Sequence, residues 1–275
     1  MTRFLILDGY SQQGRERLAS GGMLLAGTMY RNMLQRLRPD SDSDIVCVAD
    51  PQASLPQPLE SYDAMLWTGS SLSIYENRPE VTQQIELARQ AFKIGVPAYG
   101  SCWALQLAVV AAGGEVERSP HGLTFGLSYG ITLMPEGAAH SVYQGRAALF
   151  DALASHYDIV KTMPPTSQVL ARSHRSNVQA AHIEHEKGTF FATQYHPEFN
   201  FEVLSGMVKS RTALLVEQGF YPDLEAAETE ATDFEHLHSP YPDEALVKKY
   251  KLNDSVLDID QRQNEFKNWL AEMQL

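Results

Sequence analysis

The chain has 275 residues, 44% of them apolar, and a formal net charge of −12. This length suits one large domain or a domain with an appendage, and the acidic balance argues against binding to nucleic acid or to an anionic membrane. No apolar run approaches the roughly 20 residues that a membrane-spanning helix needs. The apolar stretch at the N-terminus is too short for a signal peptide, so it is predicted to be the first buried strand.

Strand-like and helix-like segments alternate in the first part of the chain, which predicts a parallel or mixed sheet covered by helices. Short apolar runs predict strands at residues 3–7, 45–48, 64–67 and 96–99. Helical spacing of apolar residues predicts helices at residues 23–37, 79–93 and 103–112. Residues 8–17 are mostly polar and are expected to form a solvated loop at the ligand-binding edge of the sheet. Contact with the leaving-group side of a substrate, or with a partner, is the alternative for this segment.

The pattern changes after residue 113. Apolar runs predict strands at residues 122–133, 169–171, 178–185 and 189–195, which would extend the sheet with antiparallel strands. Helices are predicted at about residues 202–218, 224–236 and 260–273, and the acidic run at 222–244 is expected to be a solvated face. Phe266, Trp269 and Leu270 form an apolar stripe that predicts packing on the same chain, with a dimer contact or a synthase docking site as alternatives.

The chain contains two cysteines, Cys47 and Cys102, and no Cys-x-x-Cys pair. Two thiols do not make a disulfide framework, so we expect a reducing, cytoplasmic setting. Cys47 lies in an apolar run and is predicted to be a small core residue. The nine histidines do not indicate a metal site, because His182 and His185 would lie on opposite faces of a strand. We expect neither a metal nor a cofactor.

Residues 100–106 read Gly-Ser-Cys-Trp-Ala-Leu-Gln and follow a predicted strand. A cysteine between a strand and a helix is lifted off the end of the sheet, and the helix dipole favours its thiolate. The N–H of Trp103 is placed to donate to an oxyanion that forms beside Cys102. Ala104 stands where a Gly-x-Cys-x-Gly elbow would have its second glycine. The segment predicts a catalytic nucleophile.

A second apolar strand ends in Tyr-His-Pro-Glu at residues 195–198. Alternate residues of an extended segment face the same way, and Pro197 keeps the chain extended. His196 is therefore predicted to act as the base for Cys102, with Glu198 holding its other ring nitrogen.

Together these two motifs resemble the class I, triad-type glutamine amidotransferase domain, whose members include the glutaminase domains of GMP synthases and γ-glutamyl hydrolases. The resemblance covers roughly residues 1–215 and implies an α/β, flavodoxin-like mixed sheet with helices on both faces and a nucleophile elbow. It also implies a Cys-His-Glu triad that forms a γ-glutamyl thioester from glutamine. Residues 216–275 would then be a helical C-terminal extension packed on this domain.

The resemblance extends to further binding residues. Residues 68–71, Thr-Gly-Ser-Ser, occupy the place of the family's Ser-Gly-Gly-Pro turn, with Ser70 where the family has its second glycine and Ser71 where it has proline. The resemblance implies that the Ser70 N–H is the second oxyanion donor and that Gly69 helps to bind the substrate. Gln106 matches a residue that binds the amino-acid end of the substrate. The family's Ser-His-x-Asp stretch, whose backbone holds that same end, is matched by Ser155, His156, Tyr157 and Asp158.

The predicted activity is hydrolysis of the γ-glutamyl amide bond of glutamine or of a γ-glutamyl-amine conjugate. About 60 residues follow residue 215, and no Gly-x-x-x-x-Gly-Lys-Ser/Thr sequence indicates a synthase domain. One alternative is a glutaminase subunit that delivers ammonia to a separate synthase, and another is a non-catalytic regulatory subunit. An α/β-hydrolase with a cysteine nucleophile is disfavoured, because its acid would precede the histidine in the chain. The expected partners are a small-molecule substrate, a synthase subunit in the first alternative, and a second copy of the chain.

Overall fold

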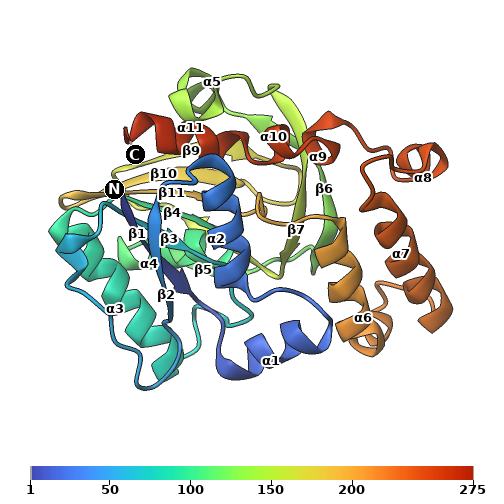
Figure 1. The fold of residues 1–275 in the computed structure, drawn as a ribbon, viewed down its shortest axis with the longest axis horizontal. Helices are drawn as coiled ribbons and strands as arrows, with labels where there is room; N and C mark the ends of the chain where they lie inside the picture. The colour runs from blue at the N-terminus through green and yellow to red at the C-terminus, as the bar shows by residue number, and fades with distance from the viewer. Residues whose placement is uncertain (1, 275) are drawn as a thin grey trace.

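The computed structural model describes residues 2–274. A mixed sheet of nine strands, in the order β2-β1-β3-β4-β11-β10-β9-β6-β7, forms the centre of the molecule (Figure 1). These strands are β1 (Arg3–Asp8), β2 (Asp42–Cys47), β3 (Ala64–Trp67), β4 (Ala98–Ser101), β6 (Thr124–Leu133), β7 (Leu149–His156), β9 (Ser167–Arg172), β10 (Ala180–His185) and β11 (Gly188–Thr193). A separate antiparallel pair joins β5 (Glu115–Arg118) to β8 (Asp158–Thr162).

Strands β2, β1, β3, β4 and β11 lie side by side and run parallel, whereas the pairs from β11 through β10, β9 and β6 to β7 are antiparallel. The order β2-β1-β3-β4 is that of flavodoxin-like folds, in which ligands bind at the carboxyl ends of the strands. The segments that leave β3, β4 and β11 therefore meet at one edge of the sheet. This edge receives the turn at Gly69, the Cys102 elbow and His196.

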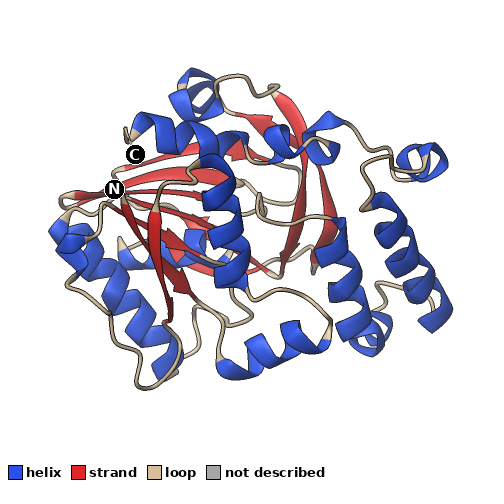
Figure 2. Cartoon of the chain, viewed as in Figure 1, coloured by secondary structure: helices blue, strands red, loops and turns tan. Residues whose placement is uncertain are grey.

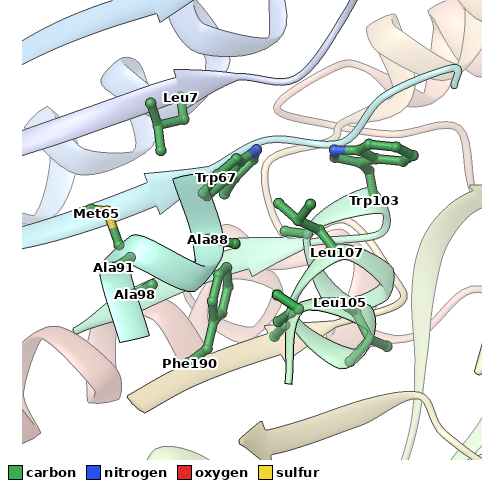
Figure 3. Packing of buried hydrophobic residues seen from close by; sticks show 14 of the residues in the cluster. Leu7, Met65, Trp67, Ala88, Ala91, Ala98, Trp103, Leu105, Leu107 and Phe190 are labelled. Atoms are coloured by element: carbon green, nitrogen blue, oxygen red, sulfur yellow. The ribbon is translucent and has the colours of Figure 1, made fainter. Parts of the chain in front are cut away.

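Helices cover both faces of the sheet (Figure 2). On one face α3 (Pro79–Ile94) and α4 (Trp103–Ala111) pack on a cluster that includes Leu7, Trp67 and Phe190, shown in Figure 3. On the other face α2 (Ala26–Leu37) and α11 (Asn264–Glu272) pack on Phe4 and Ile6. Alternation along β1 sends successive apolar side chains to opposite faces, and burial on both faces explains why this strand is continuously apolar.

A third apolar cluster lies between α1 (Gln12–Ser20), α6 (Phe201–Glu217) and α7 (Leu224–Leu237) and includes Phe125 of β6 and Leu153 of β7. After residue 215 the chain continues through α7, α8 (Glu244–Lys249), α9 (Asp254–Leu257) and α10 (Ile259–Arg262) to α11. The α11 side chains Phe266 and Trp269 lie against Tyr99 of β4, with ring centroids 4.9 and 5.5 Å away. The last helix thus contributes directly to the core of the sheet.

Several parts of the fold differ from the sequence predictions. The segment at residues 8–17 is not a loop throughout, because α1 begins at Gln12 with Ser11 as its N-cap. Strands β5, β7 and β8 were not predicted, and β7 carries Ser155 and His156. Cys47 is only partly buried, since it ends β2, which is an edge strand of the sheet. A short helix, α5 (Pro135–Ala139), was also not predicted.

None of the helices within residues 2–274 is both long and apolar enough to cross a membrane. In the same residues no group of three or more His, Cys, Asp and Glu side chains is arranged to hold a metal ion.

Candidate active site

Cys102 occupies a strained elbow between β4 and α4. Its backbone has φ 53° and ψ −99°, a positive φ that non-glycine residues rarely adopt. The Cys102 N–H donates to the carbonyl of Thr193 at 2.6 Å, which ties the elbow to the end of β11. The thiol is buried, and its Sγ lies 3.7 Å from the carbonyl oxygen of Ser155. Strand pairing therefore fixes a residue whose conformation would be unfavourable alone.

His196 lies beside Cys102 and is held by Glu198. The two residues follow the end of β11, and His196 Nδ1 lies 2.6 Å from Glu198 Oε1. Its backbone N–H donates to the carbonyl of Leu153 at 2.8 Å, and Phe199 stacks on the imidazole with ring centroids 3.8 Å apart. The other ring nitrogen, Nε2, is buried and has no hydrogen-bond partner among the described residues. This nitrogen is free to exchange a proton with a thiol or a leaving group.

Gly69 brings the thiol and the imidazole together. A Cβ placed on Gly69 would lie 2.9 Å from Cε1 of His196 and 3.8 Å from Cβ of Cys102. The side chains of Cys102 and His196 therefore both lie next to Gly69, whose lack of a side chain leaves room for them. The turn after β3 needs glycine here for close approach rather than for its backbone angles.

Glu198 is oriented by a hydrogen-bond chain that the sequence did not indicate. Tyr30 OH donates to Ser101 Oγ at 2.7 Å, and Ser101 Oγ donates to Glu198 Oε1 at 2.9 Å. Tyr30 lies on α2, and Ser101 directly precedes Cys102. Ser101 stands in the cysteine motif and offered a sequence signal, whereas nothing near Tyr30 did.

The charges of the site favour a protonated histidine. Burial of the His196 ring disfavours the imidazolium, but the Glu198 carboxylate and the Cys102 sulfur outweigh burial and raise the pKa of His196 to about 10. The imidazolium carries a proton on Nε2, the ring nitrogen that Glu198 does not hold.

Trp103 and Ser70 are the two residues whose backbone N–H groups are expected to bind an oxyanion. Trp103 is the first residue of α4, and the first N–H groups of a helix have no intrahelical partner. Its indole N–H donates to Gln84 Oε1 at 2.9 Å, and Gln84 Nε2 donates to the carbonyl of Gly9 at 3.2 Å. Ser70 follows Gly69, and its Oγ accepts the N–H of Leu72 at 3.2 Å. The Gln84 amide, which no sequence pattern singled out, fixes the side chain that follows the nucleophile.

A cavity of about 150 Å³ opens over Cys102 and His196. Its lining includes five residues expected to bind substrate or to support that role: Ser70, Gln106, Ser155, His156 and Tyr157. Asp158 also lines it, whereas Gly69 lines a smaller cavity together with His196 and Glu198. The structure thus brings the sequence-predicted residues to one place.

His156 is neutral near pH 7, because burial lowers its pKa to about 4. Its Nδ1 lies 3.1 Å from the carbonyl of Asp158, so Nδ1 carries the proton and donates. The buried Nε2 has no partner among residues 2–274 and is left as an acceptor. Gln106 Nε2 donates to the same Asp158 carbonyl at 3.4 Å, which links two expected binding residues.

A flavodoxin-like sheet with a cysteine elbow, a histidine and a carboxylate at its carboxyl edge is typical of cysteine-nucleophile amidohydrolases. The model of the family described as glutamine amidotransferase class-I matches residues 30–208. The chain therefore belongs to the class-I glutamine amidotransferase family, a family of cysteine-nucleophile hydrolases.

Individual relatives agree with this assignment. A γ-glutamyl-L-1-hydroxyisopropylamide hydrolase from Pseudomonas sp. is 33% identical over 276 residues, covering 98% of this chain and 92% of that protein. A glutamine-hydrolysing GMP synthase from Thermomicrobium roseum is 29% identical over 52% of this chain, but that match spans only 25% of the synthase. A crystal structure of a glutamine amidotransferase from Thermotoga maritima superposes with a TM-score of 0.63 at 16% identity, covering 94% of this chain and 98% of that one, which supports the fold.

Proposed function

We propose that the protein hydrolyses the γ-glutamyl amide bond of glutamine or of a γ-glutamyl-amine conjugate, with Cys102 as nucleophile, His196 as general acid and base, and Glu198 as the group that orients His196. The observation that carries the proposal is the His196 ring, whose Nδ1 is held by Glu198 and whose Nε2 is free beside the thiol. The resemblance along nearly the whole chain to a γ-glutamyl amide hydrolase supports it.

In the proposed reaction the Cys102 thiolate attacks the γ-carbonyl carbon and forms a C–S bond. The resulting oxyanion receives hydrogen bonds from the Trp103 and Ser70 N–H groups. The C–N bond then breaks, and the leaving nitrogen takes the proton from His196 Nε2, which leaves a γ-glutamyl thioester. Water attacks the thioester as His196 takes one of its protons, and glutamate departs with the thiolate restored.

The amino-acid end of the substrate would lie at the turn after β7. Gln106, Ser155, His156 and Tyr157 surround this part of the cavity. The unpartnered Nε2 of His156 offers an acceptor that suits an α-ammonium group. Gly69 would serve by letting the substrate, the imidazole and the thiol approach one another.

The fate of the released nitrogen separates this proposal from the second candidate. Similarity to a part of GMP synthases favours, as that candidate, a glutaminase subunit that delivers ammonia to a separate synthase. The chain after residue 215 forms helices that pack in this chain's own apolar clusters, which favours a free-standing hydrolase. Both readings suit a cytoplasmic setting, where the two thiols remain free.

The test is a screen of purified protein with glutamine and γ-glutamyl amides, in which glutamate, ammonia and free amine are all measured. Cys102→Ala is expected to lower glutamate release by at least about a thousandfold, since the nucleophile is lost. Cys47→Ala, which removes the other thiol, is the matched control and should retain activity. Substantial activity in Cys102→Ala would overturn the nucleophile assignment. Failure of a glutamine-like electrophile to label Cys102, with no turnover, would favour the regulatory-subunit reading.

A further inference from the structure

Ser101 carries a hydroxyl that faces the acid of the proposed triad. It is the last residue of β4, it directly precedes Cys102, and its side chain is fully buried. Its Oγ donates to Glu198 Oε1 at 2.9 Å. Among residues 2–274 neither Ser101 nor Tyr30 lines the cavity over Cys102. An effect of the Ser101 hydroxyl on the reaction would therefore pass through Glu198.

The direction of the hydrogen bonds along this chain follows from the groups that form it. A carboxylate can only accept hydrogen bonds, so the Ser101 hydroxyl must donate its single proton to Glu198. The Ser101 oxygen is then left as an acceptor, and the Tyr30 hydroxyl donates to it at 2.7 Å. Tyr30 is fully buried on α2, and burial raises the pKa of its hydroxyl, so it keeps the proton that it donates. Tyr30 thus holds the Ser101 hydroxyl in the orientation that directs its proton to Glu198.

Glu198 depends on this chain because its other oxygen has no partner. Oε1 accepts from Ser101 Oγ and lies 2.6 Å from His196 Nδ1, whereas Oε2 is buried without a hydrogen-bond partner among the described residues. The Glu198 side chain is 2% exposed, so bulk water does not hold it. Without the Ser101 hydroxyl, the carboxylate would be held only by the imidazole that it has to orient.

The place of Ser101 in the sequence connects the acid to the nucleophile. Residue 101 pairs with Thr193 in the parallel register of β4 and β11, and the Cys102 N–H donates to the Thr193 carbonyl at 2.6 Å. The segment that carries the thiol therefore also holds the carboxylate, one residue away. His196 has to direct Nε2 first to the leaving nitrogen and then to a water molecule. An error of about 1 Å in the position of such a group costs about a hundredfold in rate.

We propose that Ser101 and Tyr30 are positioning residues for the hydrolysis, which fix the Glu198 carboxylate relative to Cys102 and thereby set the direction of His196 Nε2. This inference rests on the proposed function. Because both hydroxyls lie away from the substrate, their loss lowers kcat and leaves KM nearly unchanged. Because Tyr30 acts only through the Ser101 hydroxyl, its loss has no further effect once that hydroxyl is gone.

The experiment is a double-mutant cycle of Tyr30→Phe and Ser101→Ala in the full chain, with glutamate release measured from glutamine and from γ-glutamyl-methylamide. Ser101→Ala keeps the backbone hydrogen bonds of β4 and is expected to lower kcat by about 10- to 100-fold, with KM within about twofold. Tyr30→Phe is expected to lower kcat by about 3- to 10-fold, the effect of one lost hydrogen bond. The double variant should match Ser101→Ala.

Tyr99→Phe is the matched control. Tyr99 is as deeply buried as Tyr30, but its hydroxyl has no hydrogen-bond partner among the described residues. Its kcat should therefore stay within about twofold of the unaltered protein. Thermal unfolding verifies that each variant is folded at the assay temperature. If Ser101→Ala does not fold, the comparison of Tyr30→Phe with Tyr99→Phe decides alone.

Alkylation of Cys102 by iodoacetamide, measured in a Cys47→Ala background, is a second readout that needs no turnover. Alkylation removes the thiol proton, which a correctly directed His196 accepts. Ser101→Ala and the double variant should therefore be alkylated at one common rate, which is slower than that of the intact protein and of Tyr99→Phe.

Three results would overturn the inference. One is a folded Ser101→Ala protein with the kcat and the alkylation rate of the intact protein. Another is a double variant whose loss is the product of the two single losses, since the hydroxyls would then act independently. The third is a Tyr99→Phe variant that loses as much as Tyr30→Phe, which would indicate a general packing effect. Absence of glutamate release from every amide by the intact protein would be a failure of the proposed function itself, and the alkylation rates would still decide this inference.

Discussion

Replacing Gly69 by alanine tests whether the turn after β3 sets the distance between thiol and imidazole. The added Cβ would lie 2.9 Å from Cε1 of His196, which is 0.5 Å short of the 3.4 Å at which ordinary contact begins. The ring has little freedom to retreat, since Glu198 holds Nδ1 at 2.6 Å and Phe199 stacks on the ring at 3.8 Å. The imidazole must therefore shift relative to Cys102.

A displacement of about half an ångström to one ångström in a catalytic group lowers rates by about 10- to 100-fold. Overpacking of this kind also destabilises a fold by about 1–3 kcal/mol. We expect kcat/KM for glutamate release by Gly69→Ala to fall by about 10- to 100-fold. The assay is coupled glutamate detection at a temperature where thermal unfolding shows both proteins to be folded, together with the rate of Cys102 alkylation.

Ser71→Ala provides the control, because it alters the same turn without adding an atom near His196. Its activity should stay within about twofold of the unaltered protein if the effect at Gly69 is steric. A fully folded Gly69→Ala protein with unaltered kcat/KM would refute the reasoning, since the imidazole would then tolerate a contact that the geometry excludes.

Two further predictions concern buried charges. The pKa of His196 is about 10 in the folded protein and 6.5 for the free side chain. Protonation of His196 therefore stabilises the fold, and this stabilisation is fully present below about pH 6.5. The contribution, up to about 5 kcal/mol, is lost as the pH rises through 10. Urea denaturation should show stability declining from pH 7 to 10, with a flatter profile in Glu198→Gln; a rise over this range would contradict the sign. Arg146 and Glu265 form an ion pair with side chains 1% and 0% exposed. Arg146→Met alone should lower the free energy of unfolding by about 3–5 kcal/mol, and adding Glu265→Leu should recover most of that loss, whereas additive losses would argue against a paired charge.

The parts of the site that the sequence predicted are those encoded by short contiguous patterns. An apolar strand, a glycine and a cysteine before a helix specify the Cys102 elbow, and His-Pro-Glu places two side chains on one side of an extended chain. Local geometry decides both features. Cys102 and His196 come close to each other only because β4 and β11 are neighbouring parallel strands.

The missed features depend on contacts between distant segments. Helix α1 has few apolar residues and buries only Gly14 and Leu18, so its helical pattern in the sequence is weak. Strand β7 was missed although it supplies Ser155 and His156, because Ala and Ser are weak strand formers and pairing with β6 stabilises it. The Tyr30–Ser101–Glu198 chain joins three elements and has no local signature.

Near the thiol, Ala104 and Ser70 depart from the family pattern. The space available at the edge of the sheet explains how both are accommodated. A Cβ on Gly100 would lie 2.3 Å from the Cβ of Ala104 and 2.6 Å from the carbonyl oxygen of Trp67. Close approach of α4 to β4 thus requires that one of the two facing positions lack a side chain, and Gly100 meets that requirement so that position 104 can carry a methyl group. At the other turn Ser70 keeps its backbone N–H while its Oγ binds the N–H of Leu72, which stiffens a turn that has one glycine fewer. The elbow and its candidate oxyanion donor are therefore compatible with alanine and serine at positions where the family pattern has glycine.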